Sequence, residues 1–130
     1  MKISAVLTTA AALLGMTGLS HAATIASPLL PTGTGTSGAC YIRNVGTKPI
    51  SLQATISQNV DFPVIVNFQN CNNAPLAAGR TCVVLVNDLP DDVFFSCSAV
   101  VAGSAKDLRG TVEVRDVSPI LKVLAAEELR

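Results

Sequence analysis

The residues best suited to chemistry in this 130-residue chain are its four cysteines, Cys40, Cys71, Cys82 and Cys97. A cysteine that does redox chemistry or binds a metal usually stands in a Cys-x-x-Cys pair or near a histidine. None of these four does so, and the single histidine, His21, precedes all of them. We therefore interpret the cysteines as two structural disulfides of an exported domain.

The spacing of the cysteines ranks their possible pairings. Cys71 and Cys82 enclose a turn-rich stretch that must reverse direction, so a bridge between them closes a short loop. Pairing Cys40 with Cys97 is then favoured, because a long link removes more entropy from the unfolded chain. The alternative joins Cys82 to Cys97, which would face each other if residues 88–91 form a four-residue hairpin loop.

Carboxylates gather at the same turn, at Asp88, Asp91 and Asp92. With the Asn87 amide they could bind Ca²⁺, and Asp91 with Asp92 could supply the acid and base of a small hydrolase. The spacing matches no familiar calcium-binding loop, however, and Asp and Asn are common in turns of any kind. We predict no metal site and no catalytic residue here, and treat the three aspartates as a candidate partner-binding loop.

A second polar loop surrounds Cys71 and contains Asn70, Asn72 and Asn73. Amide side chains can form hydrogen bonds with a sugar or a peptide, although Phe68 is the one aromatic residue nearby and surface loops are polar in most proteins. These three asparagines are candidate contacts for a protein or glycan partner.

The first 22 residues have the features of a secretory signal peptide. Lys2 gives a positive start, residues 3–19 are largely apolar, and Ser20-His21-Ala22 provides the small-x-small pattern of a cleavage site. A membrane anchor is the alternative, but threonines and glycines interrupt the apolar run. We expect a mature chain without a membrane span, secreted to a periplasm or to the medium.

Cleavage would also narrow the chemistry open to the mature chain. It removes the only histidine and both methionines, and with them common ligands of catalytic zinc, copper and haem and the base of a Ser-His or Cys-His pair. The formal charge of the whole chain is zero, whereas nucleic-acid binding rests on a surplus of Lys and Arg. We expect no cofactor and no nucleic-acid partner.

Alternation of apolar and polar residues predicts an all-β domain over residues 40–130. Residues 23–39, rich in Pro, Gly and Thr, have no hydrophobic period and are predicted to be a linker. Six strands are expected, at 40–45, 50–57, 64–68, 81–87, 94–101 and 109–115. Because turns rather than helices separate them, we predict an antiparallel β-sandwich.

The tail, residues 119–130, is compatible with two structures. Ser118-Pro119 could cap a helix, or residues 120–124 could form a hairpin with 109–115. We favour the strand.

Two stretches resemble a known family. Asn44-Val45-Gly46-Thr47-Lys48-Pro49-Ile50, and Cys71 followed by Pro75-Leu76-Ala77-Ala78-Gly79-Arg80-Thr81-Cys82, are similar to segments of Hydin-like and choice-of-anchor immunoglobulin-like domains of exported bacterial proteins. The resemblance implies an immunoglobulin-like β-sandwich in which Cys71 and Cys82 are bridged. It implies no activity, because one fold serves many functions.

The sequence as a whole favours an exported, disulfide-stabilised module that binds a partner or plays a structural part, and is not an enzyme. The alternative is a subunit of a surface fibre assembled by strand exchange, although residues 23–39 lack the alternating apolar extension which that mechanism needs. A small hydrolase built on carboxylates is the least favoured function.

Overall fold

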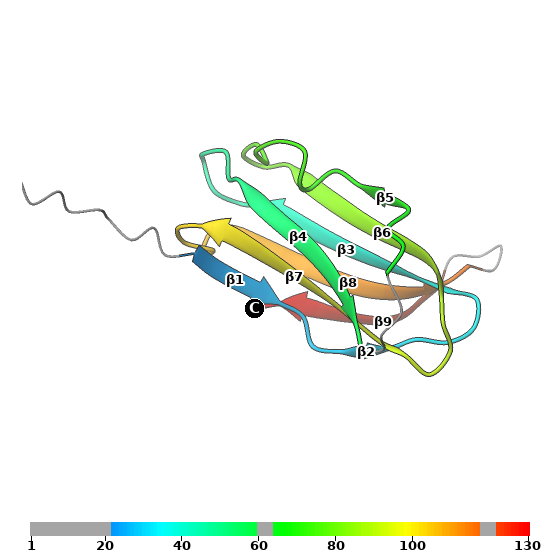
Figure 1. Cartoon of the computed structure of the whole chain (residues 1–130). Helices are drawn as coiled ribbons and strands as arrows, with labels where there is room; N and C mark the ends of the chain where they lie inside the picture. The colour runs from blue at the N-terminus through cyan, green and yellow to red at the C-terminus, as the bar shows by residue number, and fades with distance from the viewer. Residues whose placement is uncertain (1–21, 60–63, 118–121) are drawn as a thin grey trace, which may run out of the picture.

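Two antiparallel sheets packed face to face form the domain (Figure 1). The computed structural model describes residues 22–59, 64–117 and 122–130. The expected signal peptide lies outside these residues except for Ala22. No helix with the length and hydropathy of a membrane span is found in the described ranges.

The first sheet, called sheet A, is organised around its central strand. It contains β1 (Ala22–Ala26), β2 (Leu30–Pro31), β4 (Leu52–Gln58) and β7 (Phe94–Ala102). β4 pairs along one edge of β7, while β1 and then β2 pair along the other. Leu52, Ala54 and Ile56 are buried and alternate with exposed polar residues, as the sequence predicted for this strand.

The second sheet, sheet B, has five strands in the order β5-β6-β3-β8-β9. They are β3 (Thr36–Asn44), β5 (Phe68–Gln69), β6 (Thr81–Leu89), β8 (Leu108–Asp116) and β9 (Lys122–Leu129). β9 pairs antiparallel with β8, which confirms the hairpin and rules out a helix over 122–129. Residues 118–121 lie outside the described part of the chain.

Residues 23–39 are not a linker, contrary to prediction. β1, β2 and the first residues of β3 lie within this range, and Ile25 and Leu30 are buried in the core. Their pattern was hidden because β1 and β2 are short and separated by Pro28. Pro31 is tolerated because β2 is an edge strand, where one side of the backbone needs no ladder partner.

The expected strand over 64–68 is also wrong for most of its length. β5 covers only Phe68–Gln69, and residues 64–66 form no strand. Ile65 has 73% of its surface exposed, so its apolar character does not reflect a place in the core.

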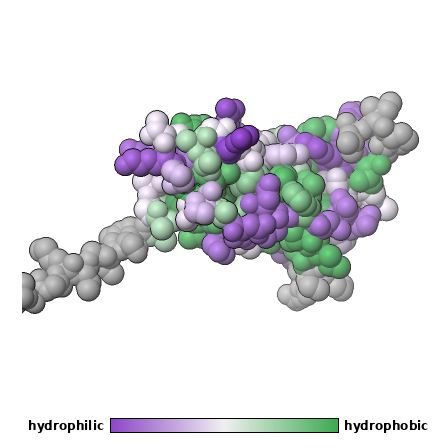
Figure 2. Space-filling model, turned by 90° about the horizontal axis from the view of Figure 1, so that it is seen from above, coloured by the Kyte–Doolittle hydropathy of each residue, from purple (hydrophilic) through white to green (hydrophobic). Residues whose placement is uncertain are grey.

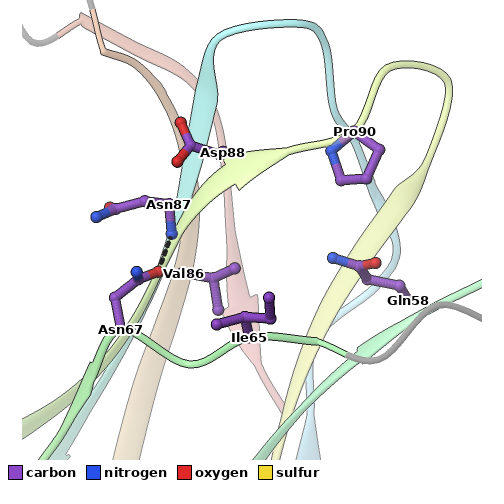
Figure 3. A pocket seen from close by; sticks show the side chains of 7 residues that line it. All are labelled: Gln58, Ile65, Asn67, Val86, Asn87, Asp88 and Pro90. Carbon is purple, nitrogen blue, oxygen red and sulfur yellow. Dashed lines mark hydrogen bonds between the residues drawn. The ribbon is translucent and has the colours of Figure 1, made fainter.

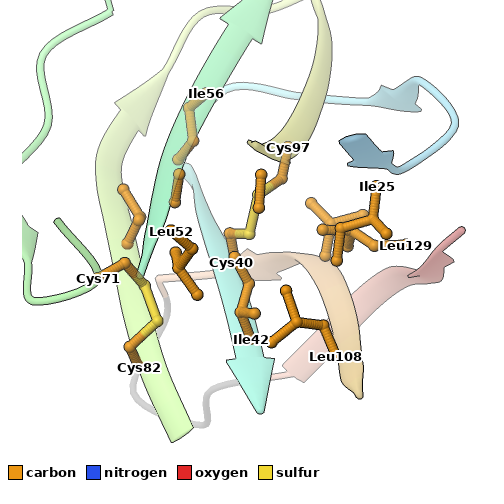
Figure 4. Packing of buried hydrophobic residues seen from close by; sticks show 14 of the residues in the cluster. Ile25, Cys40, Ile42, Leu52, Ile56, Cys71, Cys82, Cys97, Leu108 and Leu129 are labelled. Carbon is orange, nitrogen blue, oxygen red and sulfur yellow. A yellow bond between two sulfur atoms is a disulfide. The ribbon is translucent and has the colours of Figure 1, made fainter. Parts of the chain in front are cut away.

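Both disulfides have the predicted partners. Cys40 on β3 is bonded to Cys97 on β7, which joins the two sheets through the core, and Cys71 is bonded to Cys82 on β6 (Figure 4). The alternative bridge between Cys82 and Cys97 is wrong, because β6 and β7 belong to different sheets. The turn at 90–93 carries the chain from one sheet to the other and does not close a hairpin.

In the core, the side chain of Phe95 on β7 of sheet A packs closely against β3 of sheet B. The Phe95 side chain is fully buried, and its ring lies over Gly38 on β3. A Cβ added at Gly38 would overlap the Phe95 ring, so a residue with a side chain cannot occupy this position without displacing the ring. The neighbouring Phe94 points outward, as expected for adjacent residues of a strand.

Asn44 joins the two stretches on which the family resemblance rests. Its buried side chain donates hydrogen bonds from Nδ2 to the carbonyl oxygens of Lys48 (2.7 Å) and Leu76 (2.9 Å). Its Oδ1 accepts the Gly46 N–H at 2.9 Å. The backbones of Ile50 and Leu76 also bond to each other in both directions. The asparagine turn and the loop before β6 therefore form one structural unit.

Candidate functional site

A hollow lies at one side of the sandwich, between the end of β4 and the end of β6 (Figure 3). Its volume is about 390 Å³, within the size range of small-ligand sites. It is lined by Gln58, Ile65, Asn67, Val86, Asn87, Asp88 and Pro90. The segment before β5, with Ile65 and Asn67, meets the end of β6 here, and of the candidate partner contacts that the sequence offered Asp88 is among the lining residues.

Two hydrogen bonds to β6 fix Asn67 in the wall of the hollow. The Asn67 N–H donates to the Leu85 carbonyl at 2.9 Å, and the Asn67 Oδ1 accepts the Asn87 N–H at 2.6 Å. Asn67 thus continues the pairing of β5 with β6 by one residue. Ile65 stands two residues before this anchor, in a segment that is not in a strand.

Asp88 adopts a left-handed backbone conformation, with φ of 52°. Asp is among the few residues other than Gly that tolerate this region. Among the described residues that line the hollow, Asp88 supplies the one charged side chain. From these residues a ligand would meet a carboxylate, carboxamides and aliphatic side chains, a set suited to hydrogen bonding and to a cationic group.

Figure 3 shows how these side chains are distributed. Gln58 and Pro90 lie on one side, Asn67 and Asn87 on the other, with Ile65 between them. The surface seen from the top of Figure 1 is likewise mixed, with exposed hydrophobic side chains between hydrophilic ones (Figure 2). The hollow therefore offers both polar and apolar contacts to a partner.

Asp91 and Asp92 do not line the hollow. Both are exposed in the turn between β6 and β7, and the Asp91 Oδ1 accepts the Asp92 N–H at 3.2 Å. The Thr32 hydroxyl reaches this turn and lies 2.6 Å from the Pro90 carbonyl oxygen. The two aspartates take part in local turn structure. In the described ranges, no three His, Cys, Asp or Glu side chains come together as metal ligands would.

Asn70, Asn72 and Asn73 lie in the loop that follows β5 and do not line the hollow either. The Asn70 Oδ1 accepts the Val83 N–H at 2.7 Å, and Asn73 accepts a bond from Gln69 at 3.2 Å. The amide groups of Asn70 and Asn73 therefore form hydrogen bonds within the protein.

Of the three asparagines, Asn72 binds the backbone of β4 in the other sheet. Its Oδ1 accepts the Ala54 N–H at 2.7 Å and its Nδ2 donates to the Ala54 carbonyl at 3.1 Å. One side chain therefore satisfies both backbone groups of a residue on the outer edge of β4. A shallower hollow of about 250 Å³, lined in part by Asn72, Asn73 and Pro75, adjoins this contact.

The sequence pointed to Asp88 and its neighbour Asn87, but not to the other lining residues, which are Gln58, Ile65, Asn67, Val86 and Pro90. Which residues lie beside one another here depends on the packing of two sheets, and no local pattern reports it. The one available signal was Ile65, an apolar residue in a stretch without regular alternation.

Comparison with protein-family models, with curated proteins and with solved structures gives no match to the chain.

Proposed function

We propose that this protein is an exported, non-catalytic binding module that contacts a protein partner at the hollow between β4 and β6. Export is supported by the two disulfides, since such bonds persist in oxidising compartments outside the cytoplasm. The chemistry of the lining residues supports binding without catalysis, because carboxamides, aliphatic groups and one carboxylate provide contacts but no activated nucleophile.

The hollow itself is the observation that carries the proposal. Carboxamides such as Gln58 can bond to both donors and acceptors of a peptide backbone. Asp88 favours a Lys or Arg side chain of the partner, and Ile65 offers an apolar contact at the rim. A protein segment fits this combination, because aliphatic side chains of the lining, such as Ile65, stand beside carboxamides and a carboxylate.

We also propose that the sandwich is of the immunoglobulin-like type implied by the resemblance of residues 44–50 and 71–82. The bonding of Asn44 to the loop at Leu76 supports this, since it unites the two stretches. A disulfide between the sheets at Cys40 and Cys97 is consistent with it.

The binding proposal is tested by substituting Ile65→Arg in the mature protein. Ile65 is largely exposed, so the new side chain obstructs the hollow without removing a core contact. Val45→Arg is the matched control, because Val45 is also an exposed aliphatic residue and does not line the hollow. Each protein is cross-linked to the exported fraction of the source cells, and captured proteins are identified by mass spectrometry.

The proposal expects a protein captured by the wild type and by Val45→Arg but lost, at least tenfold in yield, with Ile65→Arg. Equal capture by all three proteins would reject the hollow as the binding site. If no protein is captured but the protein binds glycans, and Ile65→Arg abolishes that binding, the partner is a carbohydrate and not a protein.

One observation favours the fibre alternative. β1 is a short strand on an edge of sheet A, and Ile25 is its one buried residue, so a neighbouring molecule could exchange it at modest cost. Open-ended polymers of the mature protein in size-exclusion chromatography would support this function. Discrete species would oppose it.

A further inference from the structure

The outer edge of β9 is open for backbone pairing. Arg130, just after the strand, exchanges two hydrogen bonds with Ala26, at 2.9 and 3.0 Å, on the side away from β8. Because backbone groups alternate in direction along a strand, the N–H and C=O of Glu128 and Ala126 also point away from β8. Among the described residues, neither has a backbone partner on that side.

The side chains of β9 are exposed over most of the strand. Every residue from Lys122 to Glu128 is exposed except Ala125, which is intermediate, and Leu124 has 51% of its surface accessible. An edge strand with exposed aliphatic residues and unpaired backbone groups is a template for pairing with another chain. The Ala26–Arg130 hydrogen bonds close its C-terminal end. Ser27, Pro28 and β2 of sheet A come close to β9 as well, but no backbone hydrogen bond joins them to it among the described residues.

The charges of β9 make the strand complementary to itself. Lys122 stands at its start, and Glu127 and Glu128 stand near its end. Lys122 is opposite Asp116 and Glu127 is opposite Val112, and since these β8 residues are four apart, Lys122 and Glu127 lie on the same face of the sheet. In an antiparallel pair of β9 strands, each lysine would lie near the glutamate of the other copy.

From this geometry we propose that β9 pairs antiparallel with β9 of a second copy of the chain about a two-fold axis. The pairing joins two five-stranded sheets into one continuous sheet and brings the exposed Val123 and Leu124 of the copies together. It is independent of the partner proposed for the hollow between β4 and β6.

The first test substitutes Ala126→Pro in the mature protein. The Ala126 N–H points away from β8, so proline removes no hydrogen bond within the domain, but it removes one from each copy at the interface. The wild type is expected to show a concentration-dependent dimer in analytical ultracentrifugation, with the dissociation constant raised on the order of tenfold or more by Ala126→Pro. Ala126→Thr, which keeps the N–H, is the matched control and should still dimerise.

The second test exchanges the charges. Lys122→Glu and Glu127→Lys should each weaken the dimer several-fold, because like charges then meet twice at the interface. An equimolar mixture of the two variants should form a heterodimer, since each acidic strand then faces a basic one. Asp116 lies opposite Lys122 in the same molecule, but repulsion there persists in the mixture and cannot account for restored association.

A wild-type protein that stays monomeric at every accessible concentration would overturn the proposal. So would a dimer that neither Ala126→Pro nor the charge changes weaken. Circular dichroism and the disulfide content of each variant establish that it is folded, so a loss of association can be assigned to the edge.

Discussion

The two sheets of this protein differ completely in their charged residues. The strands of sheet A contain none, whereas those of sheet B contain nine: Arg43, Asp88, Arg109, Glu113, Arg115, Asp116, Lys122, Glu127 and Glu128. The outer face of sheet A carries instead small and hydroxyl side chains such as Thr24, Thr55 and Ser98. In the strands of sheet A, the polar side chains that face water are therefore uncharged, whereas the strands of sheet B also present charged side chains.

The edges of the sheets are protected in correspondingly different ways. In sheet A, the Asn72 amide bonds to the β4 edge, and Pro28 interrupts the opposite edge between β1 and β2. In sheet B, the β9 edge carries charges, a register shift near Leu124 and, at its C-terminal end, two hydrogen bonds between Arg130 and Ala26. Charges hinder random partners but not a complementary one, which is why the proposed self-association is assigned to the edge of sheet B.

The largest predicted effect comes from separating the two sheets. Replacing Cys40 and Cys97 together by Ala should lower the free energy of unfolding by about 4 kcal/mol on the chain-entropy model, since the bridge spans 57 residues. The same change at Cys71 and Cys82, separated by 11 residues and confined to the sheet B side, should cost about 3 kcal/mol. Urea unfolding of both variants measures which bridge contributes more to the free energy of unfolding. A larger loss on removing the Cys71–Cys82 bridge would contradict the inter-sheet role of the Cys40–Cys97 bridge.

A second comparison contrasts the inner and outer faces of sheet A. Phe95→Ala should cost about 3 kcal/mol or more, because the ring is fully buried against Gly38 and a cavity remains. Phe94→Ala, one residue away but 43% exposed, should change stability by less than about 1 kcal/mol. Thermal unfolding of the two variants measures the difference in stability between them. Similar losses of stability would mean that Phe95 does not face the core while Phe94 faces solvent.

A smaller effect is expected at the β4 edge. Asn72→Ala removes two hydrogen bonds to Ala54 and should cost about 1–2 kcal/mol. It should also raise the tendency of the protein to aggregate, because an uncharged edge is then open. Asn73→Ala, which removes only a side-chain contact with Gln69, is the control. Light scattering during mild heating should separate the two variants.

The smallest effect is expected on the outer face of sheet B, at the ion pair of Glu113 with Arg115. Partial burial lowers the pKa of the Arg115 guanidinium, but the Glu113 carboxylate and Tyr41 outweigh it and raise that pKa overall, so the arginine stays charged. Glu113→Gln should cost under about 1 kcal/mol, because the pair is partly exposed to solvent. The cost should shrink further in high salt, and a cost that salt leaves unchanged would point to packing instead.

The parts of the fold that the sequence predicted depend on local patterns. Alternation located β4, β7 and β8 to within a few residues because one face of each strand is buried. The turn residues between Cys71 and Cys82, and the entropy removed by a long link between Cys40 and Cys97, favoured the pairing that the structure has, because both are properties of the chain itself.

The parts that failed depend on contacts between distant residues. The turn near Pro90 signals a change of direction, but whether the chain then enters the same sheet or the other one is decided by the whole core. β1 and β2 were missed because strands of five and two residues show too little periodicity. Asn72 was expected to face a ligand because its bond to Ala54, 18 residues away, leaves no local trace.

Peptide mapping without reduction tests the central claim most directly, namely an exported sandwich with β6 and β7 in different sheets. The protein is taken from the exported fraction and cleaved after Lys and Arg and before Asp. The account predicts a first residue at Ala23, peptide 81–87 linked to the one that contains Cys71, and peptide 92–106 linked to the one that contains Cys40. A link between 81–87 and 92–106, or free thiols, would contradict it.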